Sequence, residues 1–284
     1  MPLNTAIVGQ SIPALEHQVD ERWLMAYAAS LNDLNPLYMD TKANTVIGHP
    51  VFPVCVEWPV ILNTRVLAGN QSLTAEESAR GVHAAHDLHL HAPIKAGDTL
   101  STSATMIGAQ AIKPGAAYTM KLDTYNQDGV LVAETYQLGI YRGVEVVGES
   151  HFSQTLPRLP ERTDPSQGKE TKIHIPGSAA HTYTECAHIW NPIHTDRDVA
   201  LKAGLPDIIL HGTATLALAI TQIVNEYADG DPLRVKRLGG RFAAMVLMPS
   251  TITVASHCKG NTVSYHVLTE DEQTAISSGF VVIG

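Results

Sequence analysis

Two short segments in the second half of the sequence hold the residues best suited to acid–base chemistry. The first reads Asn191-Pro-Ile-His194-Thr-Asp196, and the second, Ile208-Ile-Leu-His211-Gly212, follows it closely. An unperturbed histidine titrates near pH ~6.5, so His194 could exchange a proton with a substrate at neutral pH. Asn191 could hold a water molecule or orient the imidazole ring.

The stretch after Gly212 predicts a buried helix whose first turn could stabilise negative charge. Residues 213–227 are apolar on most sides, which is typical of a helix enclosed by other elements. The N–H groups of a first helical turn have no partner within the helix, and they carry the positive end of its dipole. Such groups can bind the oxygen of a polarised carbonyl, and a glycine there lets the ligand approach the backbone closely.

Each of these residues also has a purely structural interpretation. A histidine at a helix start is often only a cap or a satisfied core residue, and Asn191-Pro192 could be only a turn. We expect Asp196 to cap the helix that follows it. His211 could shape its loop, and Gly212 could serve helix–sheet packing. The combination of these residues at this spacing favours a functional site around His194.

Length and composition restrict the classes of protein and partner. The chain has 284 residues, 44% hydrophobic and 17% charged, which is enough apolar material for one large or two medium folded domains. The formal net charge of −9 argues against nucleic acid as a partner, because phosphate binding needs a basic face. No apolar run is long enough to cross a bilayer and we find no secretory signal, so no membrane partner is expected.

The cysteines and a histidine-rich stretch bear on compartment and metal binding. The three cysteines are widely spaced and form no C-x-x-C pair, which indicates a reducing compartment, and we expect the cytoplasm. Residues 83–91 are rich in histidine, but on a strand His89 and His91 share one face while His86 points to the other. We therefore predict no metal site there.

Hydrophobic patterning predicts helices followed by antiparallel strands in each half, and the fold class is therefore α+β. In the first half we expect helices over 20–31 and 55–67 and strands over 86–91, 99–107, 117–125 and 130–141. In the second half we expect helices over 196–203 and 213–227 and strands over 236–245, 251–257, 262–268 and 274–283. The polar, proline-containing segment 148–171 is predicted as a linker between an N-terminal domain, residues 1–147, and a C-terminal domain, residues 172–284.

An internal repeat relates the two halves. Residues 27–40 align without gaps on residues 183–196 at a constant offset of 156, and a tyrosine, an asparagine, a proline and an aspartate recur. Because the match falls at the same place in each half, we interpret the chain as a fused tandem duplication.

The run N-P-I-H-x-D, followed by A, A-G and I-L-H-G, resembles the hydratase-2 motif of MaoC-like (R)-specific enoyl-CoA hydratases and 3-hydroxyacyl-thioester dehydratases. The first half is similar to the related dehydratase N-terminal domain around Asp33-x-Asn35-Pro36-x-Tyr38. The resemblance implies a tandem, or double, hot-dog fold, in which each half wraps a curved antiparallel sheet around a central helix. It also implies His194 as the acid–base residue, Asn191 as its support and the Gly212 amide as the oxyanion donor.

The sequence departs from the family motif at one catalytic position. In the family an aspartate lies five residues before the catalytic histidine, and Ile189 occupies that place here. The first half has the opposite defect, since Asp33 is present but Tyr38 stands at the histidine position. Three possibilities stay open: His194 acts alone, another residue replaces the aspartate, or the site binds acyl thioesters without this reaction. The candidate replacements are His188, Glu185 and Asp33 reaching across from the other half.

The resemblance implies a hydro-lyase that reversibly hydrates a 2-enoyl-CoA, or dehydrates a 3-hydroxyacyl-CoA, without a cofactor or a metal. We expect a short or branched acyl group, because only four phenylalanines and three tryptophans are present to line a long tunnel. A hot-dog thioesterase that uses Glu57, or a non-catalytic acyl-thioester-binding module, is the alternative. A homodimer is expected, since most oligomers are symmetric. The expected substrate-binding residues are His211, Arg241, Asp33 and Asn35.

Overall fold

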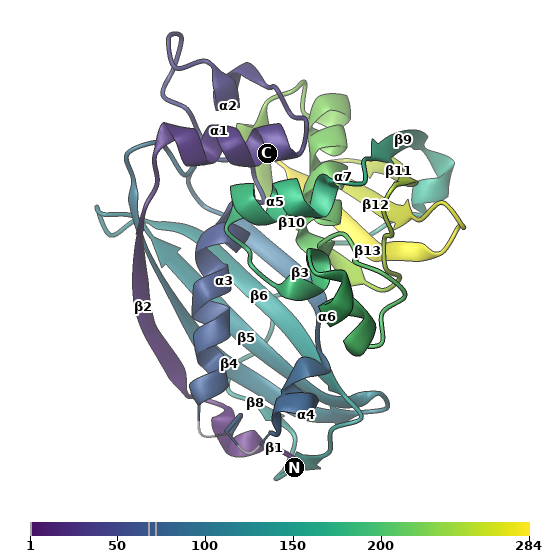
Figure 1. Ribbon diagram of the computed structural model, residues 1–284. Helices are drawn as coiled ribbons and strands as arrows, with labels where there is room; N and C mark the ends of the chain where they lie inside the picture. The colour runs from purple at the N-terminus through teal and green to yellow at the C-terminus, as the bar shows by residue number, and fades with distance from the viewer. Residues whose placement is uncertain (1, 68, 72) are drawn as a thin grey trace.

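The computed structural model describes residues 2–67, 69–71 and 73–284. Its main feature is an eleven-stranded sheet with the strand order β2-β4-β5-β6-β3-β10-β13-β12-β11-β9, and β8 pairs with β4. Figure 1 shows the sheet passing from the N-terminal half, in purple to teal, into the C-terminal half, in green and yellow. All of its neighbouring strands are antiparallel, so the expected α+β class is confirmed.

The N-terminal half contains four helices among its described residues, two short 3-10 turns and the first strands of the sheet. In chain order the elements are β1 (Leu3–Asn4), η1 (Thr5–Ile7), β2 (Ser11–Gln18), α1 (Glu21–Ser30), α2 (Pro36–Met39), α3 (Pro53–Asn63), η2 (Thr64–Val66), α4 (Ala75–Ala79), β3 (Gly81–Leu90), β4 (Thr99–Ile112), β5 (Gly115–Tyr125), β6 (Leu131–Arg142) and β7 (Val146–Val147).

The C-terminal half repeats the plan of a long central helix beside a run of antiparallel strands. In chain order the elements are β8 (His151–Phe152), η3 (Pro165–Gln167), β9 (Lys169–Ile175), α5 (Ala179–Ala187), η4 (Pro192–His194), α6 (Arg197–Lys202), α7 (Gly212–Tyr227), η5 (Pro232–Arg234), β10 (Val235–Phe242), β11 (Ser250–Lys259), β12 (Thr262–Leu268) and β13 (Thr274–Ile283).

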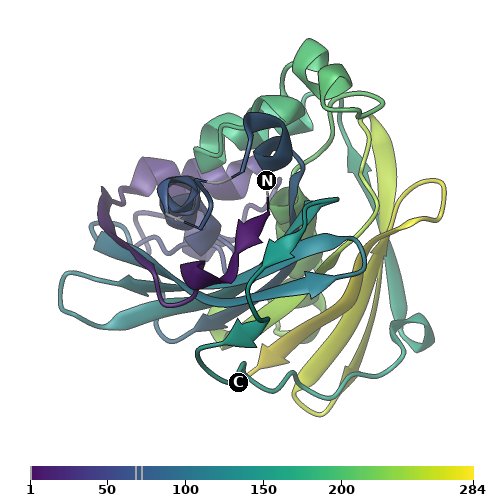
Figure 2. The same cartoon turned by 90° about the horizontal axis from the view of Figure 1, so that it is seen from below.

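The main core lies between the helices and the sheet, and it is shared by both halves. Seen from below, the sheet curves and the helices lie on one side of it (Figure 2). A single cluster of buried apolar side chains joins Phe52 and Val56 of the first half to Ala217 and Ile220 of α7. Burial of apolar area is the dominant favourable term in folding, so this shared core binds the halves together.

Helix α1 and helix α5 meet where the sequence repeat predicts related positions. Tyr27 and Tyr183, which align at the offset of 156, are both buried, and their hydroxyl oxygens lie 3.3 Å apart. The indole N–H of Trp23 on α1 donates to the Cys186 carbonyl on α5 at 3.0 Å. Equivalent residues of the two halves therefore face each other across this contact.

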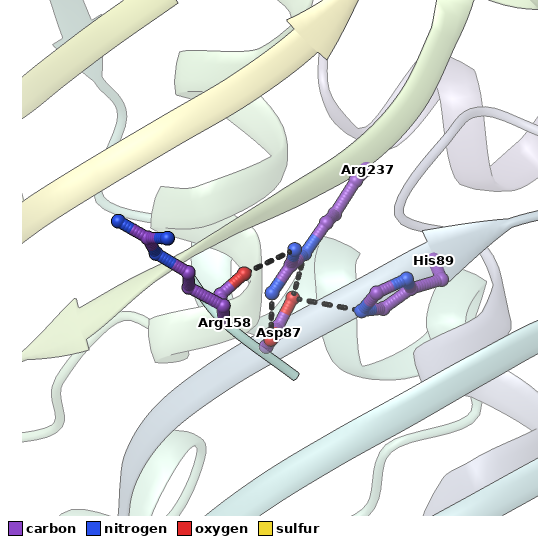
Figure 3. A network of polar contacts seen from close by, with 4 residues as sticks. All are labelled: Asp87, His89, Arg158 and Arg237. Carbon is purple, nitrogen blue, oxygen red and sulfur yellow. Dashed lines mark hydrogen bonds and ion pairs between the residues drawn. The ribbon is translucent and has the colours of Figure 1, made fainter. Parts of the chain in front are cut away.

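The two halves of the sheet are joined by the antiparallel pairing of β3 with β10. Figure 3 shows the polar contacts at this junction. The Asp87 carboxylate of β3 accepts two hydrogen bonds from Arg237 of β10, one from Nε–H at 2.8 Å and one from Nη2–H at 2.7 Å. Nη1 of Arg237 donates to the Arg158 carbonyl at 3.0 Å, and the His89 ring nitrogen Nε2 lies 3.4 Å from Asp87. A bidentate, half-buried pair of this kind fixes the register of the two strands.

The predicted helices and strands are present, and the ends of several of them are shifted by a few residues. Helix α1 begins after Asp20, whose carboxylate accepts from the Trp23 N–H at 2.8 Å, as an N-cap does. Strands β12 and β13 have the expected bounds. Helix α3 starts two residues earlier than expected and gives way to a 3-10 turn at Thr64.

The hydrophobic pattern missed β2, β9 and α5. The two strands form opposite edges of the sheet, so each pairs with a single long neighbour and only a few of its side chains are buried. Helix α5 packs against α1 and consists mainly of small and polar residues, so no series of large apolar side chains marks it in the sequence. Strand β9 begins at Lys169, inside the segment expected to be a linker. Among the described residues, no helix is long and apolar enough to span a membrane.

Candidate active site

His194 is held by the short turn that precedes helix α6. Asn191 caps this turn, with its side-chain oxygen accepting from the Ile193 N–H at 3.5 Å, and Pro192 occupies the first position. The Nδ1–H of His194 donates to the Ile209 carbonyl at 2.8 Å. Because Nδ1 carries the proton of the neutral ring, Nε2 is left as the acceptor that a general base needs.

A second imidazole is stacked on the first. The ring centroids of His194 and His211 lie 3.7 Å apart at an interplanar angle of 25°, and His211 Nε2 lies 3.2 Å from the Thr184 hydroxyl. Burial lowers the pKa of His194 to about 4. Burial, together with the neighbouring His194, lowers the pKa of His211 to about 2. Both rings are therefore neutral at pH 7, and His194 can accept a proton.

Helix α7 presents the free end of its backbone beside these rings. It begins at Gly212, and no described side chain caps its first turn. The Thr215 N–H bonds back to the His211 carbonyl at 3.0 Å, so the N–H groups of residues 212–214 precede the first intrahelical bond. A Cβ at Gly212 would lie 3.1 Å from Phe242 Cδ1, and its absence leaves the approach to the backbone open. The helix end can therefore receive an oxygen with developing negative charge.

These groups line one cavity of about 300 Å³ between the two halves. From the C-terminal half the expected residues that line it are His194, His211, Gly212 and Asn191. From the N-terminal half one face of α3 lines it, with residues at helical spacings of three and four: Val54, Glu57, Trp58, Ile61 and Leu62. The structure thus brings four of the seven expected site residues to a single cavity.

Glu57 of α3 is a buried carboxyl on the wall of that cavity. It is 1% exposed, and its Oε1 accepts from the Thr135 hydroxyl at 2.5 Å. Its Oε2 has no hydrogen-bond partner among the described residues. Burial raises the pKa of Glu57 to about 7, although the bond from Thr135 opposes this shift. One signal for Glu57 was present in the sequence, namely a carboxyl on the helix predicted over 55–67 of the first half.

The ionisation of Glu57 is expected to make stability fall as pH rises. Its folded-state pKa of about 7 lies above the ordinary value of 4.5, so the folded chain holds the proton more tightly than the unfolded chain. This stabilisation is complete below pH ~4.5, and ~3 kcal/mol is lost as pH rises through ~7. Glu57→Gln cannot ionise, so denaturant unfolding at pH 5 and pH 8 should show a smaller loss for the variant.

The exposed Glu161 supplies the matched control for that experiment. In Glu161→Gln the free energy of unfolding should change between pH 5 and pH 8 by the same amount as in the original chain. Parallel pH profiles for the original chain and Glu57→Gln would show that folding does not raise the pKa of Glu57.

The position of the family aspartate stays apolar in three dimensions. Ile189 is 5% exposed and lines the cavity of His194. His188 adopts a left-handed backbone conformation and is exposed, and its ring stacks on Trp23 at 4.4 Å. Glu185 is also exposed on α5. None of the three candidates named for replacement, including Asp33, lines this cavity, whereas Glu57 does.

Asp33 and Asn35 lie at the equivalent place in the other half, in a separate cavity of about 1040 Å³. The Asp33 carboxylate accepts from the Thr221 hydroxyl of α7 at 2.9 Å and from the Asn35 N–H at 3.2 Å. The Asn35 side chain donates to the Gly230 carbonyl at 2.6 Å. His49 Nδ1 accepts from a backbone N–H, so its Nε2–H donates to Thr221 at 3.2 Å. These bonds tie the first half to α7.

Asp33→Ala is expected to lower the free energy of unfolding by about 1–3 kcal/mol, because it leaves the buried Thr221 hydroxyl without its acceptor. Thr221→Val removes the same bond from the other side. In a double-mutant cycle measured by denaturant unfolding, the two changes should couple by about 1 kcal/mol. Asp128→Ala, in an exposed turn, serves as the control and should stay within about 0.5 kcal/mol of the original chain. If the two changes lower the free energy of unfolding additively, the hydrogen bond between Asp33 and Thr221 does not contribute to stability.

Arg241, the last of the expected residues, does not line either of these cavities. It is exposed on β10, immediately before Phe242, which does line the cavity of His194. Asp196 caps α6, with its carboxylate accepting from the Val199 N–H at 3.2 Å, as expected. Within the described residues there is no cluster of three or more histidine, cysteine or acidic side chains that could hold a metal.

Two protein families match the chain. Residues 160–277 match the family described as MaoC like domain. Residues 6–135 match the family described as FAS1-like, dehydratase domain region. The chain therefore combines a dehydratase region of the FAS1-like type in its first half with a MaoC-like domain in its second half. The MaoC-like match includes both short segments around His194 and Gly212, and the other match includes Glu57 and the repeat of the first half.

The MaoC-like chain has relatives among characterised proteins. It is 32% identical over 130 residues to the peroxisomal enoyl-CoA hydratase 2 of Arabidopsis thaliana. The aligned region covers 46% of this chain and 38% of that protein. It is 25% identical over 287 residues to the peroxisomal multifunctional enzyme type 2 of Mus musculus, covering 96% of this chain and 38% of that protein. The chain therefore spans less than half the length of these relatives.

Solved structures share the fold of the MaoC-like chain. A MaoC-like dehydratase from Phytophthora capsici superposes with a TM-score of 0.84 at 18% identity, covering 97% of this chain and 95% of that one. A Mycobacterium tuberculosis protein described as having a double hot-dog fold superposes with a TM-score of 0.63 at 14% identity. The superposition covers 98% of this chain and 96% of that one. The expected double hot-dog fold is thereby confirmed.

Proposed function

We propose that this MaoC-like chain is a hydro-lyase that adds water reversibly to a 2-enoyl-CoA, or dehydrates the corresponding 3-hydroxyacyl-CoA. The observation that carries the proposal is the placement of His194 and the start of α7 on one cavity. A base and an oxyanion site are the groups that this hydration requires. The printed names of two relatives, enoyl-CoA hydratase 2 and 3-hydroxyacyl-thioester dehydratase Y, support the same reaction class.

In the proposed mechanism His194 works as a single acid–base group. Its Nε2 takes a proton from water while the water oxygen attacks C3 of the enoyl group. The electron pair of the double bond moves through the conjugated system onto the thioester oxygen, where the Gly212 N–H and the α7 dipole stabilise the enolate. The enolate then returns its electron pair to C2, which takes the proton from the His194 imidazolium. One water molecule is added, and the base is regenerated.

The remaining residues have supporting roles in this proposal. Asn191 lines the cavity beside His194, where its amide can orient the attacking water. His211 stacks on the catalytic ring and limits its rotation. Arg241 is a positive charge exposed next to the cavity wall, and we assign it to a phosphate of CoA. Asp33 and Asn35 are assigned to the contact between the halves instead of to the substrate.

A spectroscopic assay tests the reaction directly. Crotonyl-CoA and a panel of longer, branched and dicarboxylic enoyl-CoAs would be mixed with the full chain, and the absorbance of the conjugated thioester would be followed. Loss of that absorbance with an intact CoA ester supports the hydratase. No turnover of any enoyl-CoA, together with measurable binding, would overturn it in favour of a non-catalytic acyl-thioester-binding module.

Thioester hydrolysis is the second candidate function, and Glu57 is the observation that favours it. A hot-dog thioesterase needs a carboxylate on or near a central helix, and Glu57 lines the cavity from α3. Hydrolysis releases free CoA thiol, which a thiol reagent detects in the same assay. Thiol release at the rate of substrate loss would favour this function over hydration.

We also propose that the protein is a cytoplasmic homodimer. Cys55, Cys186 and Cys258 are all free thiols, which supports a reducing compartment. The sheet ends in edge strands β2 and β9, which leave backbone groups for pairing or for cover by another surface. Light scattering should give twice the mass of the chain, and fractionation of the source cells should place the protein in the cytoplasm. A monomer, or recovery with peroxisomes, would contradict these proposals.

A further inference from the structure

We propose that the cavity contains a second, polar subsite that binds an uncharged hydroxyl or carbonyl group on the acyl chain of the substrate. This inference rests on the proposed function, since it names the class of acyl group that the hydratase would accept. The subsite consists of Glu57 and Trp58 of α3, His86 of β3 and Gln137 of β6, all of which line the cavity. A plain alkyl chain would offer no hydrogen bond to any of these polar groups.

Buried polar atoms without partners are the observation that points to a ligand. Glu57 is 1% exposed and His86 is 2% exposed. Within the described part of the chain, Glu57 Oε2, Trp58 Nε1 and both ring nitrogens of His86 have no hydrogen-bond partner. Buried polar groups in proteins are nearly always hydrogen-bonded, so this set requires a partner that the chain itself does not supply. A polar group of the bound acyl chain would be that partner.

The sheet places the subsite away from the reacting atoms. Phe242 of β10 packs beside Gly212, and Glu57 is anchored to β6 through the Thr135 hydroxyl. Strand β3 lies between β6 and β10, so the two anchors are two strand spacings, roughly 10 Å, apart across the sheet. Thr135 pairs with Leu88 of β3 whereas Arg241 pairs with Ala85, so the anchors are also offset along the strands. The ring of His83, on β3, lies edge-on to Phe242 with centroids 4.7 Å apart. This separation suits a group several bonds along the acyl chain rather than the water that attacks C3.

The hydrogen-bonding character of the subsite fits an uncharged group. Trp58 Nε1 can only donate, and a neutral imidazole donates through one nitrogen and accepts through the other. Burial lowers the pKa of His86 to about 4, so this ring is neutral at pH 7. A carboxylate ligand would meet the Glu57 carboxyl, and Arg65, the one cation among the described lining residues, is exposed. A hydroxyl, which donates and accepts, or a carbonyl matches this set.

Substrate preference of the full-length protein tests the subsite. Oct-2-enoyl-CoA would be compared with analogues that carry a hydroxyl or oxo group at each carbon from the fifth to the eighth, and with the terminal carboxylate. We expect kcat/KM for the best hydroxy or oxo substrate to exceed that of the plain chain by about tenfold, the factor of one hydrogen bond in a buried site. Equal or better turnover of the plain chain, or preference for the carboxylate, would overturn the proposal.

Variants assign the preference to the proposed residues. Glu57→Leu keeps the approximate size of the side chain but removes its polar atoms. The ratio of kcat/KM for the hydroxy or oxo substrate to kcat/KM for the plain chain should therefore fall toward one. Glu57→Gln retains hydrogen-bonding atoms and should keep most of the ratio, which also covers the case that the leucine variant does not fold. Asn63→Ala, exposed on the same helix and outside the cavity lining, should leave the ratio unchanged. A proportional loss for all substrates in Glu57→Leu would show that Glu57 acts in the reaction, and the subsite would be rejected.

Binding without turnover separates this inference from the hydratase proposal. Octanoyl-CoA and its hydroxy and oxo derivatives are saturated at C2–C3 and cannot be hydrated. Calorimetric titration should give an affinity about tenfold higher for the best polar derivative even if the chain turns over no enoyl-CoA. Equal affinities would remove the subsite while leaving the hydratase proposal intact.

Discussion

His194→Ala is expected to lower kcat for enoyl-CoA hydration by about 10²–10⁴-fold, the range that a positioned acid–base group contributes. The Nδ1–H bond to the Ile209 carbonyl fixes the tautomer in which Nε2 is the base, and alanine removes that base. Initial rates with crotonyl-CoA at saturating concentration measure the effect. Since the substitution leaves Gly212 and the cavity wall in place, KM should change far less than kcat.

Two further variants separate the loss of the base from the loss of the fold. His194→Asn keeps an N–H at the position of Nδ1, so it can still donate to the Ile209 carbonyl, but it cannot take up a proton. Its rate should therefore fall as far as that of His194→Ala. His151→Ala, an exposed histidine on β8, should leave the rate unchanged. Because burial lowers the pKa of His194 to about 4, kcat/KM should not fall when pH decreases through 6.5. Full activity in His194→Asn would rule out His194 as the base.

Gly212→Pro is expected to lower kcat by about 10²–10³-fold, the usual effect of removing one oxyanion donor. Position 212 is the first residue of α7, where a proline ring fits the helix and removes only an N–H that has no intrahelical partner. The preceding residue, His211, already has the extended backbone that proline requires, with φ −59° and ψ 137°. The variant therefore tests the backbone donor without unfolding the helix.

Gly212→Ala is the matched control for this change. Both variants add a Cβ that would lie 3.1 Å from Phe242 Cδ1, but alanine keeps the N–H. The ratio of their kcat values therefore isolates the hydrogen bond to the thioester oxygen from the steric effect. Equal rates for the two variants would show that the Gly212 N–H does not contact the developing enolate, and a donor elsewhere in the cavity would have to replace it.

The sequence determined the local geometry of the candidate site. Asn191 and Pro192 specify the start of a tight turn, because an asparagine side chain caps it and proline fits its first position, and this turn carries His194. The long apolar run after Gly212 likewise specified a buried helix over 213–227, and the structure begins this helix one residue earlier, at Gly212. These features depend on neighbours in the chain, so their residue types and spacing are sufficient to predict them. The repeat at an offset of 156 identified Tyr27 and Tyr183 as equivalent positions, and the tertiary structure places their hydroxyl groups in contact.

Only the tertiary structure decided what surrounds His194. The Ile209 carbonyl that orients its ring, the burial that keeps it neutral, and the arrival of Glu57 from the other half all depend on the folding of distant segments. The pairing of β3 with β10 brings the halves together, and neither strand carries a local pattern that names its partner across the junction. For the same reason Asp33, which the sequence offered as a replacement for the missing aspartate, lies in a different cavity. Spacing along the chain fixes turns and helix starts, whereas convergence of side chains follows from long-range packing and strand register.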